Sequence, residues 1–285
     1  MRSGHVALAG RPNAGKSSLL NLLVGEHLAL VSPKAQATRL PVVGLRTEGD
    51  TQFVFHDLPG LLEPSYPLQE RMRALALEGA ERADVILHLH PAPDAPAPSF
   101  AEAAGLPGPP KAPVILVHTQ CDLVPSAARA TLAASGVMTS AVTGEGVTEL
   151  LERVRELLPE RDHAYPQDDL GTQPLRFFAA EFLREAAFEH LEDELPYAFA
   201  AEIEEFREST DPVYIRANLF IERESQKRIL VGKGGATLKM IGQHARRRLE
   251  ALLGRRVYLD TWVQVLPRWR RDPVQLRRFG FPDAP

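Results

Sequence analysis

Hydrophobic positions in the first half of the chain fall into short, nearly continuous runs separated by longer stretches with helical periodicity. The runs occupy residues 6–9, 52–56, 85–89, 114–118 and the region around 137–141. Runs of this length, bounded by turn residues, are typical of buried strands. Their alternation with helices predicts an α/β domain, in which a mostly parallel sheet carries helices on both faces.

Prolines interrupt this pattern twice. Residues 91–113 contain eight of them and allow only a short helix around Phe100–Ala104, where such a domain normally has a full crossover helix. Residues 159–174 are polar and punctuated by proline, as in a linker between domains. We therefore expect a first domain at 1–160, a linker at 161–174 and a smaller α+β domain at 175–285.

The second domain shows both helical and strand periodicity. A helical stretch at 175–195 precedes residues 213–221, which alternate between apolar and polar as in a half-buried strand. We predict another strand at 228–231, a helix that follows Gly235 and ends at Gly254, and a strand at 256–265. Four acidic residues are predicted to form a solvated helical face without a catalytic role: Glu202, Glu204, Glu205 and Glu208.

Composition limits the class of protein. A chain of 285 residues suggests two domains, and 44% hydrophobic content is enough for both cores. The single cysteine, Cys121, excludes an internal disulfide and is typical of a reducing compartment. Met1 leads almost directly into the first predicted strand, and no apolar run approaches the ~20 residues of a spanning helix. We therefore expect a soluble, cytoplasmic protein.

The net charge of −4 hides an asymmetry. Residues 1–172 carry 14 basic and 20 acidic side chains, whereas residues 223–279 carry 15 basic and 4 acidic ones. A compact basic segment indicates a polyanionic partner, either a nucleic acid or an anionic membrane surface. A solvated, arginine-rich face is the alternative explanation.

A glycine-rich loop follows the first predicted strand and opens into a helix. It fits the pattern G-x-x-x-x-G-K-[ST] with Gly10, Arg11, Pro12, Asn13, Ala14, Gly15, Lys16 and Ser17. The backbone N–H groups of such a loop, together with the helix N-terminus, bind the phosphates of a nucleotide. We expect Lys16 to reach the β- and γ-phosphate oxygens and the Ser17 hydroxyl to ligate Mg²⁺.

Two further segments have the spacing of a phosphate-loop enzyme. The sequence Asp57-Leu58-Pro59-Gly60 follows the strand at 52–56. There, an aspartate holds Mg²⁺ through water and the glycine N–H detects a γ-phosphate. Thr38 is placed to close over Mg²⁺. Its position is explained equally well if it is simply a polar residue of a loop.

Guanine selection is predicted from the next strand end. Asp122 follows the strand at 114–118 and can accept two hydrogen bonds from the edge of guanine, a donor pair that adenine lacks. Ser140 and Ala141 can offer a backbone N–H to the guanine oxygen. The predicted nucleotide is therefore GTP or GDP rather than ATP.

With these pieces assembled, the chain resembles the Era family, bacterial GTPases of small-ribosomal-subunit assembly. The matching segments are GRPNAGKSS at 10–18, which includes Ser18, SPKAQATR at 32–39, DLPG at 57–60, SAVTGEGVTEL at 140–150, ILVGKGGATLKMIG at 229–242 and the tail at 269–280. The resemblance implies a Ras-like GTP-binding domain followed by a type II KH domain. It also implies catalysis through Lys16, Thr38 and Gly60.

The resemblance implies cofactors and partners as well. These are GTP or GDP with Mg²⁺, the 3′ end of 16S ribosomal RNA and the 30S subunit. In related enzymes the asparagine at the position of Asn13 assists a K⁺ ion. We also expect the protein to be monomeric and to make a peripheral contact with the inner face of the cell membrane.

The chain departs from the family pattern at its guanine motif. The family's Asn-Lys-x-Asp is replaced by Thr119-Gln120-Cys121-Asp122. Thr119 lacks the amide that ties this loop to the phosphate loop and the base, and Gln120 is a shorter cover for the ring. Losing two such contacts is expected to cost about 1–3 kcal/mol, roughly ten- to hundredfold in affinity.

The chain has two milder departures from the family, and a residue that it shares with the family predicts slow hydrolysis. Leu58 replaces the family's threonine, and the proline-rich crossover is short. Leu61, an apolar residue as in the family, cannot orient the attacking water as glutamine does in Ras. The short crossover suggests an eroded domain.

RNA binding is predicted in the second domain. A lone G-x-x-G is a weak signal, but Gly232, Lys233, Gly234 and Gly235 lie between a predicted strand and a helix within the basic segment. In KH domains this loop clamps the backbone of about four single-stranded nucleotides. The predicted phosphate contacts are Lys233, Lys239, Arg246 and Arg247. Trp269, Arg270 and Arg271 offer a ring and two charges for a further contact, whereas packing of the C-terminus explains Trp269 equally well.

Three functions remain open at this stage. The first is a slow GTPase that couples nucleotide state to ribosomal RNA binding during 30S maturation. The second is an RNA-binding assembly factor with a vestigial nucleotide site. The third, a membrane-surface protein, ranks last because no strongly amphipathic helix accompanies the basic tail.

Overall fold

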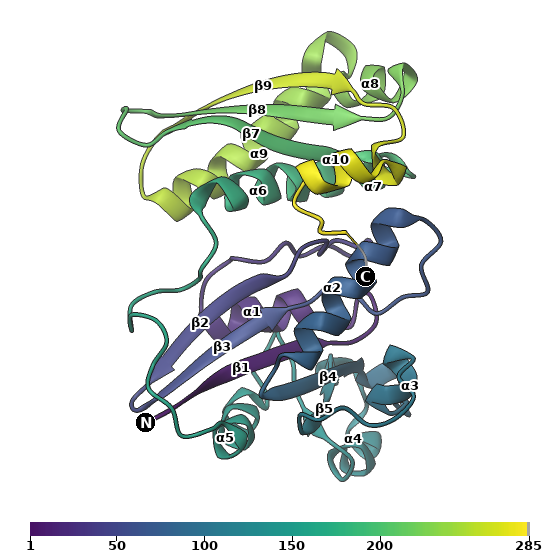
Figure 1. Cartoon of the computed structure of the whole chain (residues 1–285), viewed down its shortest axis with the longest axis vertical. Helices are drawn as coiled ribbons and strands as arrows, with labels where there is room; N and C mark the ends of the chain where they lie inside the picture. Colours follow the sequence, from purple (N-terminus) through teal and green to yellow (C-terminus); the bar gives the residue numbers. More distant parts are fainter. Residues whose placement is uncertain (284–285) are drawn as a thin grey trace. The chain divides into compact units, whose positions relative to one another are not determined.

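The computed structural model describes residues 1–283, which fold into two compact units. One is built mainly from residues 1–172 and the other mainly from residues 173–283. Figure 1 labels most of the helices and strands, which are numbered in chain order. Within the described residues, no helix is long and apolar enough to cross a membrane.

A six-stranded sheet forms the centre of the first unit, in the order β2-β3-β1-β4-β5-β6. Its strands are β1 (Arg2–Ala9), β2 (Val42–Glu48), β3 (Thr51–Asp57), β4 (Val85–Pro91), β5 (Val114–Thr119) and β6 (Val137–Met138). Only the pairing of β2 with β3 is antiparallel. The five predicted strands are confirmed, although β6 is shorter than expected, and the edge strand β2 was not predicted.

Four α-helices lie between these strands along the chain, and a fifth follows β6. They are α1 (Lys16–Val24), α2 (Pro67–Glu81), α3 (Phe100–Ala104), α4 (Ser126–Ala133) and α5 (Val147–Leu157). The short crossover helix α3 matches its prediction. It begins with a capping box, in which the Ser99 hydroxyl accepts from the Glu102 N–H and the Glu102 carboxylate accepts from the Ser99 N–H.

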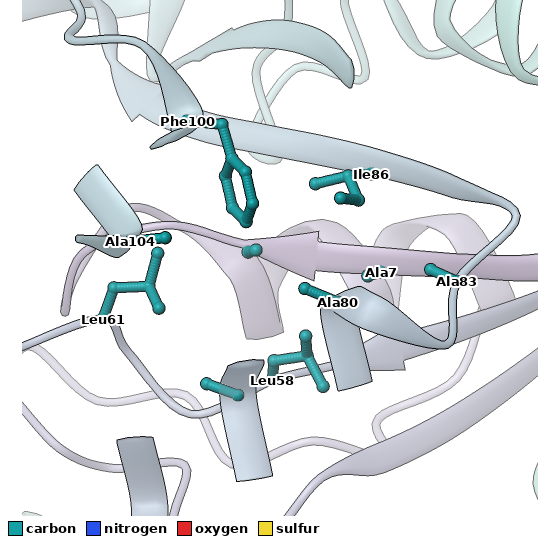
Figure 2. Close-up of a cluster of buried hydrophobic side chains, with 10 residues drawn as sticks. Ala7, Leu58, Leu61, Ala80, Ala83, Ile86, Phe100 and Ala104 are labelled. Atoms are coloured by element: carbon teal, nitrogen blue, oxygen red, sulfur yellow. The ribbon is translucent and has the colours of Figure 1, made fainter. Parts of the chain in front are cut away.

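An apolar cluster joins α2 and α3 to the sheet. Figure 2 shows Leu58 and Phe100 packed with Ala7, Ala80 and Ile86. Leu58 has no exposed surface, and a Cβ at Gly79 would come within 2.5 Å of its side chain. Leu58, at the position where the family has threonine, is therefore a core residue. Small residues on α2 leave room for its side chain.

The predicted linker begins on the surface of the first unit. The Gln52 side chain accepts hydrogen bonds from the N–H groups of Ala164 and Tyr165 and donates one to the Tyr165 carbonyl. The Leu45 N–H donates to the Leu170 carbonyl oxygen at 2.9 Å. These bonds hold residues 164–170 against β2 and β3, so most of this polar segment is ordered along the sheet.

The second unit is an α+β fold with a three-stranded sheet, ordered β7-β8-β9. Its strands are β7 (Ala200–Arg207), β8 (Val213–Ile221) and β9 (Val257–Val265), and its helices are α6 (Leu175–His190), α7 (Leu195–Ala198), α8 (Glu224–Val231), α9 (Ala236–Leu253) and α10 (Pro273–Arg278). Strand β8 runs antiparallel to β7 and parallel to β9. Helices α6 and α9 pack against each other and against the sheet (Figure 1).

Two predictions for this unit were wrong. Residues 228–231 end helix α8 rather than form a strand. Leu230 is fully buried and Ile229 is 55% exposed, as on one face of a helix, and a short apolar run does not distinguish the two structures. The four glutamates lie on β7 or just beyond it rather than on a helix, because β7 is an edge strand held by its pairing with β8.

Candidate functional site

The phosphate loop lies at the carboxyl end of β1. The strand ends at Ala9 and α1 begins at Lys16, so residues 10–15 form the connection, as the sequence predicts. Gly10 is required by close approach, because a Cβ there would lie 2.3 Å from the Leu89 carbonyl oxygen. The loop therefore packs against the backbone of β4 too closely for a side chain at this point.

Lys16 is buried within its own loop. Its Nζ donates hydrogen bonds to the carbonyl oxygens of Gly10 at 3.3 Å and Arg11 at 3.0 Å. Burial lowers the pKa of Lys16 to about 8, although the nearby Asp57 carboxylate opposes this shift. The protein therefore does not fully offset the cost of burying the ammonium charge, and an anionic ligand would stabilise the charged form of Lys16.

Ser17, Thr38 and Asp57 come together from three distant segments. The Ser17 hydroxyl donates to Asp57 Oδ2 at 2.6 Å, and the Thr38 hydroxyl donates to the same oxygen at 3.2 Å. The two hydroxyl oxygens lie 2.9 Å apart. Hydroxyl and carboxylate oxygens are the hard ligands that Mg²⁺ prefers, so this donor set fits the predicted metal. The grouping of Thr38 with the other two favours a metal-site role over that of a simple loop residue.

A hollow opens beside these side chains. Its lining includes Pro12, Asn13, Gly15, Lys16, Ser17, Ser18, Thr38 and Gly60. Gly60 approaches the phosphate loop so closely that a Cβ there would lie 2.8 Å from the Pro12 nitrogen. The segment expected to sense a γ-phosphate is therefore already in contact with the loop expected to bind one.

Leu61 faces away from this hollow. Its N–H donates to the Gly10 carbonyl oxygen at 2.9 Å, and its side chain joins the apolar cluster near Phe100 and Ala104 (Figure 2). Its side chain is only 6% exposed. The packing explains why this position holds an apolar residue, and it leaves the task of orienting water to other groups.

The guanine motif corrects one prediction. Thr119 was expected to lose the bond between this loop and the phosphate loop, but its hydroxyl donates to the Ala14 carbonyl oxygen at 2.9 Å. The neighbouring Gln120 amide also reaches the Asn13 carbonyl, at 3.5 Å. The hydroxyl thus replaces the amide in joining the two loops, while Asp122 lies exposed on the 3₁₀ turn that follows.

The loop expected to bind the guanine oxygen is held by its own hydrogen bonds. The buried Ser140 Oγ accepts from the N–H groups of Val142 and Thr143, both at 3.2 Å. The Cys121 N–H donates to the Thr139 carbonyl oxygen at 3.1 Å. Burial, assisted by Glu145, raises the pKa of the buried Cys121 thiol to about 11 and so favours its protonated form.

Two contacts of the phosphate loop have no signal in the sequence. Arg11 forms an ion pair with Asp94, which lies in the proline-rich segment on a 3₁₀ turn (Ala92–Asp94). The Asn13 amide donates to the Pro33 carbonyl oxygen at 2.9 Å. No local pattern announces either pairing, because each joins segments far apart in the sequence.

The predicted RNA-binding loop lies between two helices. Residues 233–235 form a 3₁₀ turn that joins α8 to α9, so the element before the loop is a helix and not the expected strand. Gly234 and Gly235 have φ of 61° and 81°, values that favour glycine. Four basic side chains lie on the loop and on α9, at least partly accessible to solvent: Lys233, Lys239, Arg246 and Arg247.

The tail residues differ from the expected RNA contact. Trp269 has no exposed surface; its indole N–H donates to the Ala198 carbonyl oxygen at 2.8 Å, and its ring packs edge-on against Phe279. Arg270 forms an ion pair with Glu222 at 2.6 Å, whereas Arg271 is exposed. Trp269 therefore packs the C-terminus, and of the three residues only Arg271 offers an exposed charge.

The fold and the site together define a class of protein, a phosphate-loop GTPase followed by a KH domain. The sequence profile of the 50S ribosome-binding GTPase family matches residues 5–120, and that of the KH domain matches residues 194–270. The chain is 40% identical to GTPase Era of Carboxydothermus hydrogenoformans, an alignment that covers 98% of each protein. It is 39% identical to GTPase Era of Thermotoga petrophila, over 99% of this chain and 98% of that protein. The chain belongs to the Era family of GTPases.

Solved structures agree with this assignment. The structure of Era in complex with MgGDPNP and nucleotides 1506–1542 of 16S ribosomal RNA has a TM-score of 0.93 and 36% identity, over 99% of both chains. The structure of a single-residue variant of Aquifex aeolicus Era bound to GDP·AlF₄⁻ gives the same values. The similarity extends over both units of this chain.

Proposed function

We propose that this protein is a slow GTPase that binds the 3′ end of 16S ribosomal RNA and assists assembly of the 30S subunit. The grouping of Ser17, Thr38 and Asp57 beside Lys16 carries the proposal. These residues come from three segments and provide the oxygen ligands for Mg²⁺. The Lys16 ammonium group provides the positive charge for the nucleotide phosphates. Relatives with the same two units bind MgGDPNP, GDP·AlF₄⁻ and 16S ribosomal RNA.

Each nucleotide-site residue has a specific task in this proposal. Lys16 neutralises charge on the β- and γ-phosphate oxygens, and the Gly60 N–H binds a γ-phosphate when one is present. Ser17, Thr38 and Asp57 hold Mg²⁺, which supplies further positive charge to the phosphates. Asp122 selects guanine by accepting from the two N–H donors on the edge of the base. Because Leu61 is fixed in the core, hydrolysis is slow without help from another group.

The alternative is an assembly factor with a vestigial nucleotide site. It rested on Thr119, Gln120, Leu58 and the short crossover. The Thr119 bond to Ala14 and the packed position of Leu58 explain two of these departures without loss of the site. The intact metal ligands therefore favour the GTPase.

RNA binding is proposed for the basic residues around the loop at 232–235. Lys233, Lys239, Arg246 and Arg247 contact phosphates, and the glycines let the RNA backbone approach closely. A protein that assists assembly of the 30S subunit acts in the cytoplasm, and this is the location that we propose. Its contact with the inner membrane face, a monomeric state and the use of K⁺ through Asn13 stay predictions.

The test is a titration with fluorescent GDP and GTP, followed by turnover with and without an oligonucleotide of the 16S rRNA 3′ end. We expect guanine nucleotides to bind in preference to adenine nucleotides, and hydrolysis to require Mg²⁺. Lys16→Ala removes the charge that stabilises the transition state and should abolish turnover. Brisk turnover by that variant would overturn the assignment of the site.

A further inference from the structure

Three side chains with metal-ligand chemistry meet on the second unit, and none has a role in the proposed GTPase or RNA site. Glu189 and His190 end helix α6, and His244 lies in the middle of α9. One ligand atom from each lies within 4.8 Å of the other two. Among residues 1–283, this is the one set of three such side chains that meets this distance.

The packing of α6 against α9 holds these groups together. The rings of His190 and His244 meet edge-on, with their centroids 5.6 Å apart. His244 Nδ1 and Glu189 Oε2 lie 3.0 Å apart. The His244 side chain is only 19% exposed, whereas that of Glu189 is 57% exposed. The ring is therefore fixed by its neighbours and the carboxylate is free to adjust.

The donor set has the chemistry of a zinc site. Two imidazole nitrogens and a carboxylate oxygen bind Zn²⁺ with bonds of about 2.0–2.2 Å, which puts tetrahedral ligands roughly 3.3–3.6 Å apart. The Glu189–His244 pair, at 3.0 Å, already meets this spacing. The ligand atom of His190 lies within 4.8 Å of the other two and needs to move closer by at most about 1.5 Å, which a rotation of its side chain at the end of α6 can provide. A hollow of about 520 Å³ beside the cluster leaves room for water as a fourth ligand.

The charges around the hollow limit the affinity. Arg247 and Arg248 line it with the cluster and oppose a cation, but Arg248 faces Glu185 at 3.8 Å, which offsets part of its charge. Glu189 adds a second carboxylate. We propose that Glu189, His190 and His244 bind one Zn²⁺ ion and so cross-link α6 to α9. The competing explanation is a Glu–His hydrogen bond that joins the helices without metal.

Titration of Zn²⁺ into the full-length protein in excess Mg²⁺ and GDP tests the proposal, with the heat of binding as one measurement. Co²⁺ in place of Zn²⁺ gives visible absorption that reports tetrahedral coordination. We expect one Zn²⁺ per chain and a rise in Tm on saturation, because the metal binds the folded state. His27→Gln, in the first unit, is the control and should behave as the parent protein does.

Two variants remove one ligand each with little change of shape. His190→Phe keeps a ring against His244 and loses the nitrogen, and Glu189→Gln keeps the length of an exposed side chain. Each should weaken Zn²⁺ binding at least tenfold and abolish the rise in Tm. If the parent protein takes up no Zn²⁺, or if both variants bind it as tightly as the parent, the cluster is a hydrogen-bonded pair only and the proposal is wrong.

Discussion

The Thr119 hydroxyl donates a 2.9 Å hydrogen bond to the Ala14 carbonyl oxygen, across 105 residues of sequence. Thr119 is 4% exposed, so the bond is shielded from water. It joins the end of β5 to the phosphate loop, and a Cβ at Gly15 would meet the same threonine at 3.6 Å. The guanine motif and the phosphate loop are therefore held as one structure despite the altered sequence.

Removal of this hydroxyl should weaken nucleotide binding. Thr119→Val keeps the shape of the side chain but leaves the Ala14 carbonyl without its donor, a loss of about 1–2 kcal/mol. We expect the Kd for GDP to rise about five- to thirtyfold by fluorescence titration. Thr119→Ser retains the hydroxyl and is the matched control. Equal affinities for the valine and serine variants would show that the bond does not organise the site.

Replacement of Thr119 and Gln120 by the residues of the family motif should tighten nucleotide binding by a limited amount. Thr119→Asn combined with Gln120→Lys restores a lysine stem over the base. Because Thr119 already joins the two loops, we expect a gain nearer tenfold than hundredfold, or about 1.4 kcal/mol. A dissociation constant unchanged by the double substitution would mean that other contacts already supply this energy.

Burial of Lys16 should make the stability of the ligand-free protein depend on pH. Its pKa is lowered from 10.5 to about 8, so between these values the unfolded state binds more protons than the folded state. Stability therefore rises with pH in this window, by roughly 2 kcal/mol at pH 9.5 for this group. Urea unfolding of the parent and Lys16→Met proteins at pH 7 and pH 9.5 measures it. The parent should gain more than the variant, and an equal pH response would contradict the buried position of the ammonium group.

Restoration of the family's threonine at position 58 should destabilise the first unit. Leu58 has no exposed surface, and Leu58→Thr would create a cavity and bury a hydroxyl among apolar side chains. The expected cost is about 2–4 kcal/mol in the free energy of unfolding. Leu123→Thr is the control, because Leu123 is 65% exposed. Comparable midpoints in urea for the two variants would refute the core role of Leu58.

RNA binding should depend on the loop between α8 and α9 and not on the phosphate loop. Lys233→Asp with Gly234→Asp places two carboxylates where an RNA backbone must approach. The space around Gly234 is open, but its φ of 61° strains any side chain placed there; aspartate is among the residues that tolerate this backbone region best. We expect affinity for a 16S rRNA 3′-end oligonucleotide to fall at least tenfold, and the remaining binding to be sensitive to salt.

Two comparisons make this result specific. Lys16→Ala should bind the oligonucleotide as the parent does, since its change lies in the first unit. A scrambled oligonucleotide should bind the parent more weakly than the natural sequence. If the loop variant still bound the natural sequence selectively, the assignment of RNA binding to this loop of the KH domain would be wrong.

Local signals in the sequence determined most of the fold of the first unit. The phosphate loop, its strand and its helix follow from contiguous residues at 6–23, because the spacing of the loop glycines and the helix periodicity are read along neighbouring residues. The short helix α3 followed from the spacing of prolines. Strands β2 and β7 could not be predicted, because charged residues interrupt their apolar patterns and backbone pairing with β3 and β8 holds them in place.

Only the tertiary structure decided which distant side chains meet. Thr119 reaches Ala14, Trp269 turns inward to Ala198, and the histidine of α9 meets the end of α6. In each case the partner lies on another element, and residue type alone left both a surface and a buried role open. The sequence by itself determined the chemistry that the chain carries. The packing of its elements decided which of these groups come together. Hydrogen bonds and burial depend on positions in space and not on spacing along the chain.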